Sequence, residues 1–144
     1  MVALSQFLEA IAEWAESRPD IIGVALVGSH ARASANPDSD IDLVVVTTTA
    51  DDYRTDSGWI LAIHWPAQAG RVRSWRDAEY GKVWSRHLSF ADGSEVELSF
   101  TSPDWAETAP MDPGTRQVIS NGCRILWDPQ ATLRHLVAAL STGV

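Results

Sequence analysis

Two short apolar runs, the second of which carries an aspartate, most strongly constrain the fold of this chain. Residues 21–27 (IIGVALV) and 41–46 (IDLVVV) both have the composition of buried strands. Asp42 interrupts the second run, where an unpaired charge would be expensive to bury. Asp40 and Asp42 are therefore poorly explained as ordinary solvated turn residues. The pattern predicts a buried sheet in which the carboxylates of Asp40 and Asp42 interact with a partner that offsets their charge.

The remaining elements are expected around these two strands. Apolar residues at helical spacing predict a helix over 4–15 that ends near Pro19, and a second helix that opens at Asp128-Pro129. Residues 83–90 and 95–100 flank a short Asp-Gly turn and predict a β-hairpin. The other expectations are helical turns over 30–34, a turn over 35–39, a strand over 59–65, a loop over 66–76, an irregular segment over 103–114, a short helix over 115–120 closed by Asn121-Gly122, and a strand over 123–127. The sequence thus predicts one α/β domain over residues 1–144.

Composition excludes several classes of function. The 144 residues are 45% hydrophobic and carry a net charge of −8, which disfavours a nucleic-acid binder because such proteins need a basic surface. A single cysteine, Cys123, excludes an internal disulfide and a cysteine-based zinc site. The first residues lack the basic start of a signal peptide, and no apolar run is long enough to cross a bilayer. A cytoplasmic protein without membrane contact is expected.

The chemistry is concentrated in Gly28-Ser29 and in the pair Asp40 and Asp42. Two residues apart on a strand, the two carboxylates project from the same face and repel each other unless a cation neutralises them. Carboxylate-only ligands favour Mg²⁺ or Mn²⁺ over Zn²⁺. Gly28-Ser29 stands where a strand meets a helix, and a glycine there lets a phosphate approach the backbone. Together these features predict a site for a nucleoside triphosphate.

These residues resemble the signature of the nucleotidyltransferase superfamily that includes DNA polymerase β. The similarity is carried by Gly28-Ser29, by Arg32 three residues later, and by Ser39-Asp40-Ile41-Asp42-Leu43. It is closest to the minimal nucleotidyltransferases and the antibiotic nucleotidyltransferases. The resemblance implies the nucleotidyltransferase fold, α/β of the α+β type, with a mixed β-sheet flanked by helices in one domain.

The resemblance also implies the site residues and the cofactor. Asp40 and Asp42 would hold Mg²⁺ or Mn²⁺, and a third carboxylate from a later strand would join them. The apolar-acid-apolar pattern of Val96-Glu97-Leu98 favours Glu97 for that position, with Glu95 on the same face as the alternative. Glu97 would also accept the proton of the acceptor hydroxyl. Gly28, Ser29, Arg32 and Ser39 are the expected nucleotide-binding residues, with ATP as the expected donor.

Other interpretations of the same residues are weaker or remain open. Phosphatases of the haloacid-dehalogenase type also use Asp-x-Asp, but their strand precedes the pair, whereas here residues 41–46 follow it. The four histidines, His30, His64, His87 and His135, are scattered along the chain, which favours ordinary surface or core roles over metal binding. Most tryptophans are expected in the core rather than in an acceptor pocket.

Three functions follow as hypotheses. The first is transfer of a nucleoside monophosphate to a hydroxyl of a small molecule such as an antibiotic, with release of pyrophosphate. Antibiotic enzymes of the resembled superfamily usually carry an added helical region that shapes the acceptor site, whereas only one helix of reasonable length follows residue 128 here. The resemblance therefore implies that a second subunit, as in a homodimer, would complete the acceptor pocket. The second is a minimal nucleotidyltransferase antitoxin that acts on or binds a helical partner toxin. The third is a catalytically degenerate nucleotide-binding or interaction module.

Overall fold

Six strands form the centre of the molecule in the computed structural model, which describes residues 3–32 and 39–141. The elements, in chain order, are α1 (Leu4–Glu16), β1 (Ile21–Val27), α2 (Gly28–Ala31), β2 (Ile41–Thr47), α3 (Ala50–Thr55), α4 (Trp59–Ala62), the 3₁₀ turn η1 (Ala67–Ala69), β3 (Val72–Tyr80), β4 (Val83–Phe90), β5 (Glu95–Thr101), the 3₁₀ turn η2 (Pro103–Ala106), α5 (Pro113–Ser120), β6 (Arg124–Trp127) and α6 (Thr132–Ser141). Most of the turn expected over 35–39 lies outside the described residues.

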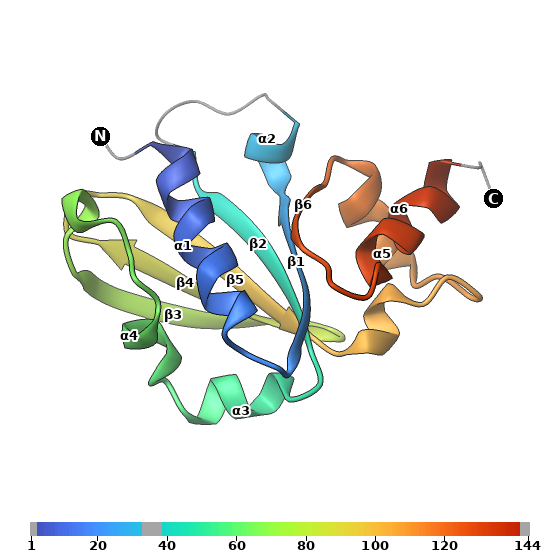
Figure 1. Cartoon of the computed structure of the whole chain (residues 1–144), viewed down its shortest axis with the longest axis horizontal. Helices are drawn as coiled ribbons and strands as arrows, with labels where there is room; N and C mark the ends of the chain where they lie inside the picture. Colours follow the sequence, from blue (N-terminus) through green and yellow to red (C-terminus); the bar gives the residue numbers. More distant parts are fainter. Residues whose placement is uncertain (1–2, 33–38, 142–144) are drawn as a thin grey trace.

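The sheet is mixed, as predicted. Its strand order is β3-β4-β5-β2-β1-β6, in which β2 and β5 run parallel and the other neighbours run antiparallel. Figure 1 shows α1 crossing one face of the sheet, with α5 and α6 gathered beside β6 and β3 at the opposite edge. The parallel β2–β5 pair lies near the middle, so side chains on these two strands become neighbours despite their distance in the sequence.

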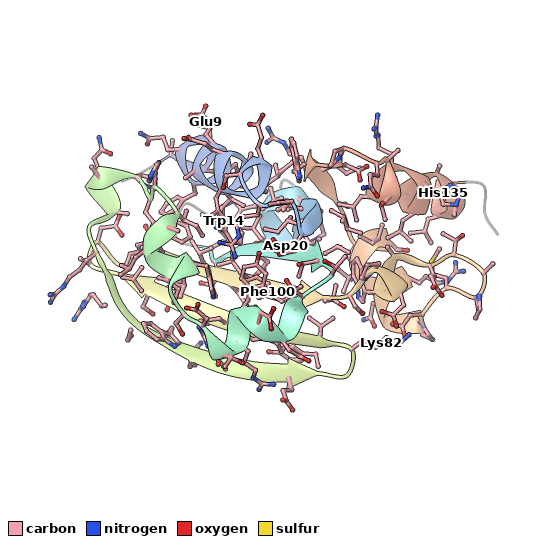
Figure 2. All side chains as sticks on the ribbon, turned by 60° about the horizontal axis from the view of Figure 1, so that its bottom comes forward. Glu9, Trp14, Asp20, Lys82, Phe100 and His135 are labelled. Carbon is pink, nitrogen blue, oxygen red and sulfur yellow. The ribbon has the colours of Figure 1, made fainter. Side chains whose placement is uncertain are left out.

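Each face of the sheet has its own apolar cluster. Against the first face pack α1, α3 and α4, and Trp14 and Phe100 lie in the layer between α1 and the sheet (Figure 2). Against the second face pack η2, α5 and α6, through buried residues such as Trp105 and Leu133. Because side chains alternate along β5, its apolar residues face the first cluster while Glu95 and Glu97 point to the second face.

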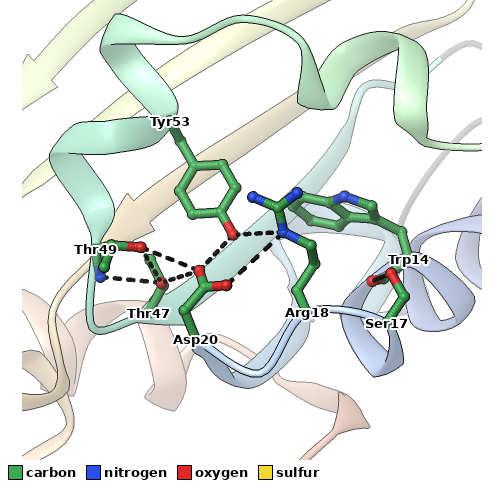
Figure 3. A network of polar contacts seen from close by, with 7 residues as sticks. All are labelled: Trp14, Ser17, Arg18, Asp20, Thr47, Thr49 and Tyr53. Atoms are coloured by element: carbon green, nitrogen blue, oxygen red, sulfur yellow. Dashed lines mark hydrogen bonds and ion pairs between the residues drawn. The ribbon is translucent and has the colours of Figure 1, made fainter.

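A polar network fixes the end of the sheet where β1 begins and β2 ends (Figure 3). The Asp20 carboxylate accepts hydrogen bonds from the hydroxyls of Tyr53, Thr47 and Thr49. Burial alone would raise the pKa of Asp20, but these hydrogen bonds lower it on balance. The network ties the α1–β1 turn to the β2–α3 turn.

Most expected elements are confirmed, and two in the middle of the chain are wrong. The segment expected as a strand over 59–65 begins with helix α4, which buries Trp59 and Ile60; apolar residues over so short a run fit either structure. The segment expected as a loop over 66–76 contains the start of β3, an edge strand with mostly exposed side chains, so no apolar alternation marks it. The segment expected to be irregular contains η2, and the short helix after it begins at Pro113 rather than at residue 115. The last helix, expected to open at Asp128-Pro129, begins at Thr132 instead, and the Asp128 carboxylate accepts hydrogen bonds from the backbone N–H groups of its first turn.

The described helices contain no segment with both the length and the apolar character needed to cross a membrane.

Candidate active site

Acidic side chains from β2 and β5 meet on the second face of the sheet. In the parallel pairing Asp42 is the register partner of Glu97, so their side chains are neighbours on the same face. Asp40 and Glu95 stand two residues earlier on the same two segments and share this face. We call Asp42 and Glu97 the inner pair. Asp40 and Glu95, with His87 of β4, form the outer group.

The inner pair is tightly held. Gly28 has a φ of +73°, and a Cβ built on it would lie 2.4 Å from Oδ2 of Asp42, so only glycine lets the chain pass this close to the carboxylate. The Ser85 hydroxyl donates a 2.9 Å hydrogen bond to Oε2 of Glu97. Burial raises the pKa of Asp42 to about 6, and the neighbouring charges of Glu97 and Asp40 act in the same direction. The inner pair is therefore a half-buried pair of acids that repel each other.

The outer group brings a histidine between two carboxylates. Nε2 of His87 lies 3.4 Å from Oε1 of Glu95 and 3.8 Å from Oδ2 of Asp40. Burial and the charge of Glu95 raise the pKa of Asp40. Burial alone would raise the pKa of Glu95, but contacts with Asp40 and His87 lower it on balance. One ligand atom from each of the three residues lies within 4.8 Å of the other two.

A pocket of about 340 Å³ opens beside the inner pair, between the second face of the sheet and α5. Asp42 and Glu97 belong to its wall, together with Trp105 of η2 and Asp112 at the start of α5. Two cationic side chains, Arg32 and Lys82, also line it. The pocket thus offers acidic, basic and aromatic groups next to the carboxylates.

The predicted site residues fall into two sets. Gly28, Arg32, Asp42 and Glu97 line the pocket, whereas Asp40 belongs to the outer group. Ser29 lies in the single helical turn of α2, and the carbonyl of Ser39 is 3.0 Å from the His30 ring, which ties α2 to the start of β2. The choice between Glu97 and Glu95 as third carboxylate stays a prediction, since the first pairs with Asp42 and the second approaches Asp40.

His87 is the site residue that the sequence interpretation missed. The scattered positions of the four histidines favour ordinary surface or core roles, yet the β4–β5 register places His87 opposite Glu97 and next to Glu95. The signal was present in the hairpin: a strand that pairs across a short Asp-Gly turn must bring residues near its middle opposite the acids of the second strand.

The donors suit divalent cations. The inner pair offers oxygen ligands only, which is the chemistry Mg²⁺ prefers. The outer group adds an imidazole nitrogen to two carboxylates. Burial, and then the charges of neighbouring acids, raise the pKa values of Asp42 and Asp40, and a bound cation would favour the ionised carboxylates by offsetting that repulsion.

Comparison with known proteins agrees with the chemistry of this site. A family model described as streptomycin adenylyltransferase matches residues 1–140. No curated protein matches the chain.

Two solved structures match this chain. An aminoglycoside 6-adenyltransferase from Bacillus subtilis matches 76% of this chain with a TM-score of 0.58 and 15% identity. The match covers 38% of that protein, so this chain corresponds to less than half of its length. A toxin-antitoxin structure with AMP-PNP matches 94% of this chain and 86% of its own, with a TM-score of 0.45 and 13% identity. The first match confirms the expected nucleotidyltransferase fold.

Proposed function

Because this chain belongs to the streptomycin adenylyltransferase family, we propose that it transfers AMP from ATP to a hydroxyl group of a small acceptor molecule. Membership of this family makes the chain a nucleotidyltransferase; ATP, the metal and the acceptor are the parts that we propose. The observation that carries the proposal is the register of β2 and β5, which pairs Asp42 with Glu97 beside the Gly28 turn and the pocket.

Asp40, Asp42 and Glu97 would hold Mg²⁺, which would neutralise triphosphate charge and strengthen the electrophilic character of the α-phosphorus. The fit rests on the oxygen-only donors of the inner pair and on the raised pKa values of Asp42 and Asp40. Glu95 is the alternative third carboxylate.

In the reaction, the acceptor oxygen attacks the α-phosphorus and its proton passes to the Glu97 carboxylate. The bond between the α-phosphorus and the oxygen that bridges to the β-phosphorus breaks, and pyrophosphate leaves. Ser85 orients Glu97 for this step through its hydrogen bond. Ser29 and Arg32 would contact the triphosphate; Arg32 lines the pocket, Ser29 lies in α2, and Ser39 shortly precedes β2. Catalysis would consist mainly of positioning and charge neutralisation.

The pocket wall carries three acidic side chains against the two basic ones, Arg32 and Lys82, and this balance favours an acceptor that carries positive charge. Asp112 adds a third acidic side chain to Asp42 and Glu97, and the buried Trp105 offers an aromatic face on which sugars and cations pack. An amino sugar with free hydroxyls combines these properties, and streptomycin is the acceptor to test first.

The test is transfer of label from α-³²P-ATP in Mg²⁺ to a panel of hydroxyl-bearing amino sugars. Asp42→Asn should reduce transfer at least about a hundredfold, since it removes a proposed metal-binding carboxylate. Asp92→Asn is the matched control, because Asp92 is exposed in the β4–β5 turn and accepts a hydrogen bond from the Ser94 backbone that asparagine can retain. Transfer that survives Asp42→Asn would refute the proposed metal role.

Two other outcomes would favour a different function. Label that appears only on a helical partner protein would favour a protein acceptor. Nucleotide binding without pyrophosphate release, over the whole panel, would favour a binding module.

A further inference from the structure

His87 is buried, with 7% of its surface exposed, yet its Nε2 atom has no hydrogen-bond partner among residues 3–32 and 39–141. A buried polar atom without a partner is unfavourable, and such atoms are uncommon in folded proteins. Here the atom points toward two carboxylates, those of Glu95 and Asp40. This arrangement calls for a positively charged group between the three side chains.

The distances distinguish an ion from a direct contact. A protonated imidazole that donates to a carboxylate does so over about 2.7–2.9 Å. The observed separations from Nε2, 3.4 Å to Glu95 and 3.8 Å to Asp40, are longer than that. Ligand atoms about 2.1 Å from one shared ion lie about 3.0 Å apart at right angles and about 3.4 Å apart at the tetrahedral angle. The separations therefore approach those of ligands around one cation.

The supporting contacts hold this geometry in place. Ser89 donates a 3.3 Å hydrogen bond to Oε1 of Glu95. On the opposite face of β4 the buried Arg86 binds Asp77 of β3 through two hydrogen bonds, of 2.7 and 2.9 Å, which fixes the strand next to His87. Contacts of this kind orient the ligands of metal sites.

We propose that His87, Asp40 and Glu95 form a site for a divalent first-row transition metal, which the site binds in preference to Mg²⁺. An imidazole nitrogen suits Mn²⁺ and its heavier neighbours better than Mg²⁺, which prefers oxygen ligands and keeps its waters. Two carboxylates and a neutral imidazole have a combined charge that one divalent cation balances. The inference builds on the proposed function, because it adds a metal preference to the same acidic site.

The experiment titrates metal-free protein with Mn²⁺, without nucleotide, and follows free Mn²⁺ by electron paramagnetic resonance. The Kd for Mn²⁺ should be at least about tenfold lower than the Kd for Mg²⁺ measured by competition. His87→Gln should raise the Kd for Mn²⁺ at least about tenfold and change the Kd for Mg²⁺ less than about threefold. His135→Gln, at an exposed position of α6, is the matched control and should bind Mn²⁺ as the wild type does.

A second measurement on the wild type does not depend on whether the variant folds. In ¹H–¹⁵N spectra of the imidazole rings, substoichiometric Mn²⁺ should broaden the His87 signals before those of the exposed His64 and His135. Equal broadening of all three, Mn²⁺ binding no tighter than Mg²⁺, or undiminished Mn²⁺ binding by a folded His87→Gln would each overturn the inference.

The two proposals fail in different ways. Mn²⁺ binding through His87 without AMP transfer would overturn the proposed function and leave the metal site standing. AMP transfer in Mg²⁺ by a protein that shows no preference for Mn²⁺ would do the reverse.

Discussion

At the scale of single residues, the site depends on how closely Gly28 approaches Asp42. The left-handed backbone of Gly28 turns the chain out of β1 directly against the carboxylate. The sequence predicts that this glycine lets a phosphate approach the backbone, and the structure gives it a second role as the surface against which Asp42 packs. A side chain at this position would displace a proposed metal ligand.

Gly28→Ala should therefore reduce both stability and transfer. The left-handed backbone costs an alanine about 1–2 kcal/mol, and the added methyl group must push Asp42 away. Urea denaturation and the AMP-transfer assay measure the two losses, and we expect transfer to fall at least about tenfold. Gly81→Ala is the matched control, because Gly81 has a similar φ of +64° with no atom within 4 Å of the added Cβ. It should lose stability and keep transfer; equal transfer by both variants would contradict the prediction.

The raised pKa of Asp42 predicts a pH dependence of stability. Because its pKa in the folded protein is about 6, above the ordinary value, the folded state holds this proton more tightly than the unfolded state does. In metal-free buffer this contribution to stability is present at low pH and is lost as the pH rises through about 6.

The free energy of unfolding, measured with urea at pH 5 and at pH 7.5, should fall more in the wild type than in Asp42→Asn. Saturating Mg²⁺ should reduce the loss, since a bound cation offsets the repulsion at high pH. The lowered pKa values of Asp20 and Asp77 act at lower pH and leave this window unaffected. Identical pH profiles of the two proteins would contradict the assignment.

At the scale of elements, the strands that could be predicted from the sequence were those with a clear apolar pattern. The strands at 21–27 and 41–47 are buried along almost their whole length, so their apolar runs predicted them well. Edge strand β3 exposes most of its side chains and owes its structure to backbone pairing with β4, which no side-chain period reveals. The acids of the site were predictable because they interrupt apolar strands. His87 was not, because its role depends on the hairpin register.

The network around Asp20 belongs to this scale, because it joins two turns (Figure 3). Tyr53→Phe removes the hydroxyl that donates to Asp20 and accepts from Nε of Arg18. We expect the free energy of unfolding to fall by about 1.5–3 kcal/mol, the range for hydrogen bonds to charged groups.

Mn²⁺ affinity should stay unchanged in Tyr53→Phe, since the network and the acidic site lie at opposite ends of β2. Tyr80→Phe serves as the control for stability, as that side chain is 61% exposed. Loss of Mn²⁺ affinity together with stability would show that the two ends are coupled.

At the scale of the whole molecule, two sets of strands meet at the parallel pair. On one side lie β1, β2 and β6, and on the other lies the antiparallel group β3-β4-β5. The metal-binding candidates are divided between them: Asp40 and Asp42 come from the first set, and Glu95, Glu97 and His87 from the second. The fold and the two acidic segments followed from the sequence. The junction itself has no local signal in the sequence, because the two strands of this parallel pair lie far apart along the chain; only the family resemblance implied that a later strand brings a third carboxylate to Asp40 and Asp42.

At this junction a bound metal would influence parts of the chain far from its ligands. Residues 48–94 separate the paired strands, so bringing β2 against β5 closes a long loop at an entropic cost. A cation bound by ligands from both sets of strands would link the two halves of the sheet reversibly. Amide hydrogen exchange along β2 and β5 should slow when metal is added, while exchange in edge strand β3 should respond less, and chelation should reverse the difference. The chain would then be most rigid when it is ready to react and loosest when its metal is withdrawn.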